Sequence, residues 1–211
     1  MKLIRSVTRS LAAVTYILIS DSGEALLVDA GAGALLRAAY LADRGYDVTH
    51  VLLTHGHFDH VCDAGKVRSL TGASVVLGAD DIPLLEVAER LCRSNGFGWG
   101  ELWVDAGLRG DTEFEAAGFR VIAMHTPGHS PGSYCYYLPE LGAVFTGDTL
   151  FRGTVGRWDL PGSDLGELRE SLRRIVYSLP PDTIVYPGHG PPTTIGRELR
   201  ENSLLLRLVR D

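Results

Sequence analysis

The sequence predicts a layered α/β fold, and two observations support this prediction. Short apolar runs rich in Val, Ile and Tyr alternate with segments of helical periodicity throughout the 211 residues. In the segment 165–179, Leu, Ile and Val side chains form one stripe and charged side chains form the opposite one, as in a helix that covers a sheet. Strands and amphipathic helices interleaved in this way are typical of stacked layers of sheet and helix.

Eight strands and five helices are expected along the chain. The apolar runs predict strands at residues 14–20, 24–29, 50–54, 74–78, 119–125, 133–138, 143–146 and 183–186. The helical patterns cover residues 33–44, 61–70, 80–93, 165–179 and 196–209. The first two strands flank an Asp21-Ser22-Gly23 turn, which predicts that they pair as a hairpin. Because no linker or low-complexity segment interrupts this alternation, we expect residues 1–211 to form a single domain.

The charge balance argues against two classes of partner. The chain carries 20 Lys and Arg against 26 Asp and Glu, so neither a nucleic acid nor an anionic membrane is an expected partner. No apolar run approaches the ~20 residues of a membrane-spanning helix. Basic residues up to Arg9 precede the apolar run 11–19 and superficially resemble a secretory signal, but Thr15 interrupts the run and no cleavage site follows. We therefore expect a cytoplasmic protein.

The three cysteines predict no disulfide. Cys62, Cys92 and Cys135 are odd in number, lie far apart and form no Cys-x-x-Cys pair, so neither a disulfide framework nor a thiolate zinc site is expected. This cysteine usage fits a reducing compartment. Cys62 is expected to be a small buried residue, as cysteine commonly is.

The most informative segment follows the apolar run 51–53. It reads Thr54-His55-Gly56-His57-Phe58-Asp59-His60 and contains three histidines and a carboxylate within six residues. Each of these groups costs several kcal/mol to bury unless a partner satisfies it. A metal ion would satisfy all four, because neutral imidazole nitrogen and carboxylate oxygen bind zinc and other divalent first-row metals.

More potential ligands follow other apolar strands, each in a turn that contains glycine. These turns are Asp29-Ala30-Gly31, Thr126-Pro127-Gly128-His129, Thr146-Gly147-Asp148 and Tyr186-Pro187-Gly188-His189. Strand ends gathered at one edge of a sheet would bring these side chains into one cleft. Because seven ligands exceed one tetrahedral site, we expect two metal ions. The first would bind His55, His57 and His129, the second would bind Asp59, His60 and His189, and Asp148 would lie between them.

In their order and spacing, these residues resemble the metallo-β-lactamase superfamily, and its glyoxalase II-like branch in particular. The family's H-x-H-x-D-H motif matches residues 55–60, its isolated histidine His129, its bridging aspartate Asp148 and its last histidine His189. The match extends over nearly the whole chain, from Asp29 onward. The resemblance implies a four-layer αββα sandwich, with two facing mixed β-sheets, helices on both outer faces and a binuclear site at one edge.

The resemblance also implies an activity, the hydrolysis of thioesters by a hydroxide held between two divalent metal ions. Zinc is the expected metal, with iron or manganese as alternatives, since imidazole and carboxylate ligands alone do not choose among them. In this scheme Asp59 orients the hydroxide while binding a metal, and Asp148 fixes the spacing of the two ions. Asp29 would support a ligand loop by hydrogen bonds from outside the metal site.

The segment 147–157 narrows the branch. Glyoxalase II and persulfide dioxygenases have similar segments after the bridging aspartate, whereas zinc β-lactamases usually carry cysteine near Asp148. Arg157 matches a basic residue that glyoxalase II places against glutathione, which makes it the candidate substrate contact. A structural ion pair of Arg152 or Arg157 with Asp159 or Asp164 is the alternative interpretation.

One departure limits what the resemblance implies about the substrate. Glyoxalase II has a C-terminal helical region that completes its glutathione site, and this chain ends only 22 residues after His189. Selectivity for glutathione is therefore not implied, and the small-molecule substrate is a thioester or a related compound. The alternatives are an iron-dependent persulfide dioxygenase, a lactone or other ester hydrolase, and a non-catalytic metal-stabilised domain. Iron content and oxygen uptake distinguish the first of these, and the number of subunits has no signal in the sequence.

Three aromatic residues, Phe97, Trp99 and Trp103, lie in a Gly-rich stretch that has weak periodicity. They could line a substrate pocket, but packing of this loop onto the body of the protein is the favoured interpretation. His50 and His125 lie within or beside predicted strands, outside the set of expected metal ligands.

Overall fold

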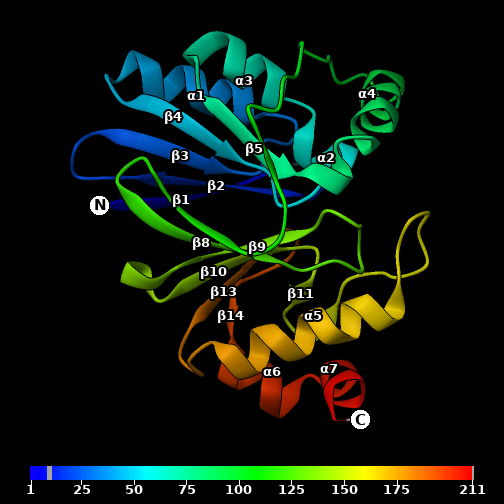
Figure 1. Ribbon diagram of the computed structural model, residues 1–211. Helices are drawn as coiled ribbons and strands as arrows, with labels where there is room; N and C mark the ends of the chain where they lie inside the picture. The colour runs from blue at the N-terminus through cyan, green and yellow to red at the C-terminus, as the bar shows by residue number, and fades with distance from the viewer. Residues whose placement is uncertain (9–10, 211) are drawn as a thin grey trace.

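The structure, a computed structural model that describes residues 1–8 and 11–210, contains two six-stranded sheets that face each other (Figure 1). The first sheet has the strand order β1 (Lys2–Val7), β2 (Val14–Ile19), β3 (Glu24–Val28), β4 (Asp47–Leu52), β5 (Ser74–Gly78) and β6 (Ala106–Leu108). The second has the order β14 (Thr193–Thr194), β13 (Ile184–Pro187), β10 (Ala143–Gly147), β9 (Tyr134–Leu138), β8 (Phe119–His125) and β7 (Thr112–Ala116). A short ribbon pairs β11 (Leu150–Phe151) with β12 (Thr154–Val155).

Both sheets are mixed, as the sequence predicts. In the first sheet β1, β2 and β3 pair antiparallel, whereas β3 to β6 pair parallel. In the second sheet only the pair of β10 and β13 is parallel. The hairpin of β2 and β3 forms around Ser22 as expected, with Ile19 opposite Ala25.

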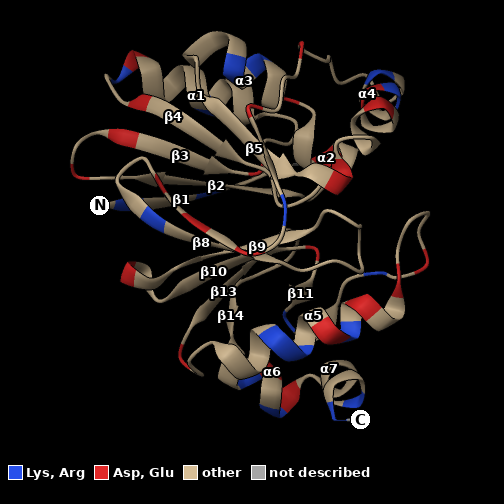
Figure 2. Ribbon diagram, in the orientation of Figure 1, with Lys and Arg blue, Asp and Glu red and all other residues tan. Residues whose placement is uncertain are grey.

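Helices cover the outer face of each sheet, which confirms the predicted four-layer αββα sandwich (Figure 1). Above the first sheet lie α1 (Ala34–Asp43), α3 (Ala64–Thr71) and α4 (Leu84–Ser94), and below the second lie α5 (Leu165–Ser178), α6 (Ile195–Glu201) and α7 (Ser203–Val209). The outer helices carry charged residues (Figure 2), whereas the core between the sheets is apolar and contains Leu26, Tyr136 and Phe145. Four layers therefore enclose three apolar cores.

Helix α5 shows how the sequence pattern determines one of these layers. Its apolar stripe buries Leu168, Leu172 and Ile175 against the second sheet. The side chain of Asp164 accepts a hydrogen bond from the backbone N–H of Glu167 at 2.8 Å, which caps the first turn. The predicted helix 165–179 is thus present to within one residue.

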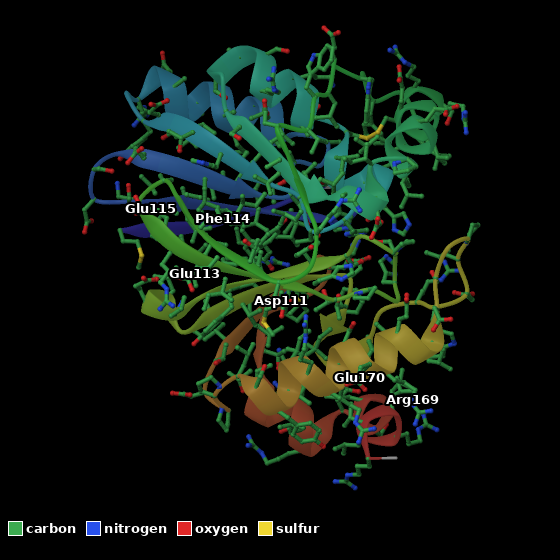
Figure 3. The ribbon with its side chains drawn as sticks, in the orientation of Figure 1. Asp111, Glu113, Phe114, Glu115, Arg169 and Glu170 are labelled. Atoms are coloured by element: carbon green, nitrogen blue, oxygen red, sulfur yellow. A yellow bond between two sulfur atoms is a disulfide. The ribbon has the colours of Figure 1, made fainter. Side chains whose placement is uncertain are left out.

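The edge strand β7 alternates between the core and solvent. Phe114 packs against the core between the sheets, while Glu113 and Glu115 on either side of it are exposed (Figure 3). Glu113 forms an ion pair with Arg120 of β8. Charged side chains on an edge strand discourage pairing with the strand of another molecule.

All eight predicted strands are present, but the structure adds elements that the sequence patterns do not show. Strand β1 is an exposed edge strand that carries Lys2 and Arg5, so it lacks the apolar run by which strands are recognised. The neighbouring run resembles a signal segment, yet residues 14–19 form the buried strand β2, and Arg9 lies outside the described residues. Among the described residues, no helix is long and apolar enough to span a membrane.

Two of the predicted helices are divided. The expected helix 196–209 consists of α6 and α7, because the side chain of Asn202 caps the second of them by accepting from the N–H of Leu205. The expected helix 61–70 begins later as α3, and a separate short helix, α2 (Phe58–Val61), precedes it. Helix α2 carries the last three residues of the histidine-rich motif, Phe58, Asp59 and His60.

The prediction that the cysteines form no disulfide is wrong. Cys62, directly after α2, is bonded to Cys92 in α4, with their Cα atoms 5.8 Å apart, while Cys135 is free and buried. The yellow bond between the two sulfur atoms is visible beside α4 in Figure 3. Sequence spacing does not reveal the pairing, because the contact depends on how α4 folds back onto α2. The cysteine argument for a reducing compartment therefore no longer holds.

We predict that reduction of this disulfide destabilises the fold. Closing a loop across a sequence separation of 30 stabilises a protein by about 3 to 4 kcal/mol in the chain-entropy model. Urea unfolding of the oxidised protein, with and without a thiol reductant, should show a loss of that order. The double variant Cys62→Ser, Cys92→Ser is the control and should not respond to the reductant. Identical unfolding curves for the oxidised and reduced wild-type protein would contradict the prediction.

Candidate metal centre

The predicted site residues lie at one edge of the sandwich, just beyond the carboxyl ends of five strands. Strands β3 and β4 of the first sheet run in the same direction, as do β8, β10 and β13 of the second. The site residues lie just beyond these strands, Asp29 after β3, residues 55–60 after β4, His129 after β8, Asp148 after β10 and His189 after β13. Helix α2 marks this edge in Figure 1. The carboxyl ends of strands are where α/β folds place their sites.

The structure places the seven expected ligand side chains close together: six of them form two triplets, and the seventh, Asp148, groups with His55 and His60. His55, His57 and His129 form one triplet, and Asp59, His60 and His189 form the other. Within each triplet one potential ligand atom of every residue lies within 4.8 Å of the others. These are the two sets that the sequence suggests; their binding of metal stays a prediction.

Asp148 lies between the two triplets. Its Oδ1 atom is 3.5 Å from His60 Nε2, and its Oδ2 atom is 3.6 Å from His129 Nε2 and 3.7 Å from His189 Nε2. A carboxylate with one face toward each group of imidazoles has the geometry of a bridge. Gly188 permits this approach, because a Cβ atom there would collide with the Asp148 carboxylate and the His60 ring.

Hydrogen bonds on the far side of the rings point unprotonated nitrogens into the site. His60 Nδ1 lies 2.8 Å from Asp29 Oδ2, and His129 Nδ1 lies 3.0 Å from the backbone oxygen of Arg157. Since both oxygens accept hydrogen bonds, each Nδ1 carries a proton, and Nε2 is the nitrogen of each ring that is left to bind a metal. This is the arrangement that orients histidines toward a metal.

Asp29 also determines which ring nitrogen of His55 carries the proton, through its hydrogen bonds to Thr54. The Asp29 carboxylate accepts from the backbone N–H of Thr54 at 2.7 Å and from its hydroxyl at 2.9 Å. The Thr54 hydroxyl donates its hydrogen to Asp29, so it acts as the acceptor for His55 Nδ1, 3.1 Å away. The proton of the His55 ring is then on Nδ1, and Nε2 is unprotonated. Asp29 itself has a positive φ of 59°, an uncommon conformation for a residue other than glycine. The structure therefore places Asp29 behind the site, in the supporting position expected from the sequence.

Two buried polar atoms of the site have no hydrogen-bond partner in residues 1–8 and 11–210. They are His55 Nε2 and Asp148 Oδ1, and both belong to the inner face of the cluster. An unsatisfied buried atom of this kind costs about 1 to 3 kcal/mol. A divalent cation accepts electron pairs from both types of atom, so the donor set fits a metal ion.

The electrostatic environment of the cluster also favours the binding of a cation. Burial and the neighbouring imidazoles lower the pKa of His57 to about 4, and burial also lowers the pKa of His55. Burial acts against the charged form of His60 too, but Asp29, Asp148 and Asp59 outweigh it and raise the pKa of His60 to about 10. The carboxylates thus favour positive charge within the cluster, while the lowered pKa values of His55 and His57 keep these two imidazoles neutral and able to bind metal.

Asp81 is a supporting residue that the sequence analysis missed. It is buried, and its carboxylate accepts from the backbone N–H of Gly56 at 2.8 Å, from that of Gly132 at 2.6 Å and from the hydroxyl of Ser130 at 2.6 Å. It thereby joins the loop of His55 and His57 to the loop that follows His129. The available signal was its position, because an acidic residue just beyond β5 repeats the pattern of the other site residues.

Two cavities adjoin the cluster on different sides and share Asp148, His129 and Arg157. One, of about 460 Å³, continues past Phe151, Arg152, Thr154, His189, Gly190 and Pro191. The other, of about 550 Å³, continues past His57 and Asp59 to α4 and to Leu160 and Pro161. A substrate that reacts at the cluster can therefore extend in two directions.

Arg157 lies where both cavities meet, although its guanidinium is already paired. It donates to the two oxygens of Asp159 at 2.9 and 3.1 Å, so the ion pair proposed as the structural alternative is formed. Contact of Arg157 with substrate stays a prediction. In the aromatic stretch, Trp99 packs against the core of the first sheet, while Trp103 is exposed.

Comparison with protein families gives a match to the metallo-beta-lactamase superfamily over residues 10–189. A probable metallo-hydrolase of Bacillus subtilis, YqgX, is 34% identical, with 90% of each chain covered. The hydroxyacylglutathione hydrolase GloC of Haemophilus influenzae is 32% identical, and the match covers 88% of this chain and 89% of the relative.

Three solved structures resemble the fold closely. The BLEG-1 B3 metallo-beta-lactamase has a TM-score of 0.85 at 32% identity and covers 97% of this chain and 99% of its own. TTHA1623 in a di-iron-bound form has a TM-score of 0.82 at 39% identity, with coverage of 95% and 98%. ETHE1 from Myxococcus xanthus has a TM-score of 0.80 at 28% identity, with coverage of 96% and 84%.

We predict that Asp81→Asn weakens metal binding. The amide would turn N–H groups toward the N–H and O–H donors that Asp81 now accepts from, which loosens both histidine loops. Changes at supporting residues of this kind lower metal affinity by about 10- to 100-fold. Competition of the protein with a fluorescent zinc chelator measures the effect.

The control for this prediction is Asp80→Asn, a change of the same chemistry one residue earlier. Asp80 is exposed and lies 3.6 Å from Arg109, away from the loops. It should leave zinc affinity unchanged. Equal affinities for the two variants would show that Asp81 does not support the metal centre.

Proposed function

Since the chain belongs to the metallo-beta-lactamase superfamily, we propose that it is a binuclear metal-dependent hydrolase that acts on thioesters. The observation that carries this proposal is the pair of complete ligand triplets with Asp148 between them. His55, His57 and His129 would hold one ion, and Asp59, His60 and His189 the other. When bound, such ions supply a Lewis acid for the substrate carbonyl and lower the pKa of a water molecule to ≈ 7.

The side chains of this protein orient that chemistry. The carboxylate of Asp59 lies 3.2 Å from His189 Nε2 and 3.7 Å from His60 Nε2, and from this position it would accept a hydrogen bond from the attacking water. Asp29, through His60 and Thr54, fixes the ring orientation of two histidines. Asp148 lines both cavities, and His57 and Asp59 line the larger one, so a carbonyl group placed where the cavities meet would lie next to the cluster.

Zinc is the metal we propose, and thioesters are the proposed substrate class. The similarity to a hydroxyacylglutathione hydrolase supports the thioester, as does the segment of residues 147–157. Iron is an alternative metal, because the chain is similar to TTHA1623 in a di-iron-bound form. Manganese is a further alternative.

A second candidate function is persulfide dioxygenation, which the segment of residues 147–157 favours, because it resembles the segment after the bridging aspartate of persulfide dioxygenases. That reaction would use one iron ion held by a subset of the ligands. The complete second triplet of Asp59, His60 and His189 supports the binuclear hydrolase instead. Oxygen uptake with a persulfide substrate, measured beside the iron content, distinguishes the two.

We predict chelator-sensitive hydrolysis of S-lactoylglutathione by the purified protein. Activity should fall on metal removal and return when zinc is added, with the bound metal quantified in the same sample. A lactone, an ester and a cephalosporin in the same panel test related hydrolyses. Absence of thioester turnover by zinc-loaded protein would contradict the proposed substrate class.

We further predict that His55→Ala lowers kcat/KM by more than about 100-fold, since loss of a direct ligand should exceed the ~10- to 100-fold effect of an outer residue. The matched control is His50→Ala, because His50 lies on β4 outside the cluster and should leave kcat/KM unchanged. Full activity of His55→Ala in metal-depleted buffer would refute the scheme.

A further inference from the structure

Helix α4 exposes apolar side chains on a face that does not pack against the body of the protein. Ala88 and Cys92 form its buried face. Leu84, Val87 and Leu91 follow one another at helical spacing on another face, and Val87 and Leu91 remain 43% and 40% exposed. An apolar stripe outside the buried face of a helix indicates that another group packs or binds against it.

The charged residues of α4 lie apart from this stripe. Glu86 pairs with Arg90, and Glu89 pairs with Arg93, one turn later in each case. Each of these four charged side chains therefore has its ion-pair partner within α4. The apolar stripe is therefore a separate face of α4.

The stripe lines the larger of the two cavities at the metal centre. Leu84, Val87 and Leu91 form one wall of the space of about 550 Å³, and Leu160 and Pro161 also line it. His57, Asp59, His129 and Asp148 line the same space. Its one cationic lining residue, Arg157, is paired with Asp159. An apolar group in this cavity would thus remain next to the reacting centre.

The smaller cavity has a different chemistry. Arg152 and Thr154 line it together with His189, and Arg152 is exposed. Phe151 and Pro191 give the smaller cavity an apolar part as well, but only this cavity adds the guanidinium of Arg152 and the hydroxyl of Thr154, and only the larger one has the aliphatic wall of α4. A thioester has the same asymmetry when an apolar acyl group is joined to a polar, anionic thiol.

We propose that the cavity walled by α4 binds the acyl group of the substrate, and that this group is an apolar chain. The stripe from Leu84 to Leu91 extends over about 10 Å at ~1.5 Å per residue, which is longer than a two- or three-carbon acyl group. The anionic thiol portion then lies toward Arg152. This inference rests on the proposed thioesterase function and defines its substrate class.

The position of this wall is fixed at both ends of α4. The Cys62–Cys92 disulfide joins the C-terminal half of the helix to α2, which carries Asp59 and His60. At the other end, the buried Asp81 holds the turn before the helix to the histidine loops. The acyl cavity and the metal ligands thus belong to one rigid unit.

The first test measures kcat/KM for glutathione thioesters that carry acetyl, butanoyl, hexanoyl and octanoyl groups. Each added methylene that enters the cavity should raise kcat/KM by about fourfold, the factor that corresponds to burial of one CH₂ group. In Leu91→Gln the ratio of octanoyl to acetyl activity should fall at least tenfold. Leu70→Gln, an exposed leucine of α3 away from the cavity, is the control and should keep the wild-type ratio.

The second test does not depend on turnover. Calorimetry of the zinc-loaded protein with butanoate, hexanoate and octanoate measures how affinity changes with chain length. Tighter binding of longer chains, lost in Leu91→Gln and kept in Leu70→Gln, supports the acyl cavity even if no thioester is hydrolysed, and in that case only the proposed function fails. Thioester hydrolysis with no dependence of activity or affinity on chain length overturns the acyl cavity and leaves the hydrolase function standing.

Discussion

The burial of imidazole and carboxylate groups in one cluster is the constraint on which the rest of this structure depends. Five histidines and two aspartates converge at one edge, and His55 Nε2 and Asp148 Oδ1 have no hydrogen-bond partner among the described residues. Without a cation, this burial carries a desolvation cost that the surrounding hydrogen bonds do not offset. A pair of divalent ions would offset it, which is why the geometry favours a metal centre over a structural network.

Supporting residues outside the cluster make the arrangement possible. Asp29 determines which nitrogen of His60 carries the proton and does the same for His55 through Thr54. Asp81 joins the two histidine loops that come from different sheets. The Cys62–Cys92 disulfide joins α4 to the end of α2. The wall that α4 forms in the larger cavity is thereby held in position relative to the candidate metal ligands. Metal binding, substrate shape and fold stability are thus coupled through a few buried contacts.

The sequence predicts the layers, and the gathering of the candidate site residues at one edge, because both arise from local patterns. Apolar runs identify all eight strands of the interior, and the turns after them carry Asp29, His129, Asp148 and His189 to one edge. The edge strand β1 is missed because its residues are exposed, and the split at Asn202 is missed because a capping side chain interrupts an otherwise continuous apolar pattern.

Other features require the folded chain. The Cys62–Cys92 bond depends on the packing of α4 onto α2, and neither cysteine has a spacing that indicates a partner. The bonds of Asp81 to Gly56 and Gly132 depend on how loops from the two sheets meet. The apolar stripe of α4 can be found in the sequence, but only the structure shows that it faces a cavity at the metal centre.

We propose that seven side chains of this protein hold two metal ions. Native mass spectrometry of the zinc-loaded protein, beside Asp148→Asn and the control His50→Ala, tests this proposal most directly. We expect two zinc ions per chain for the wild-type protein and for His50→Ala, and weaker retention of the second ion in Asp148→Asn. Saturation of the wild-type protein at one ion, or equal retention in Asp148→Asn, would contradict it.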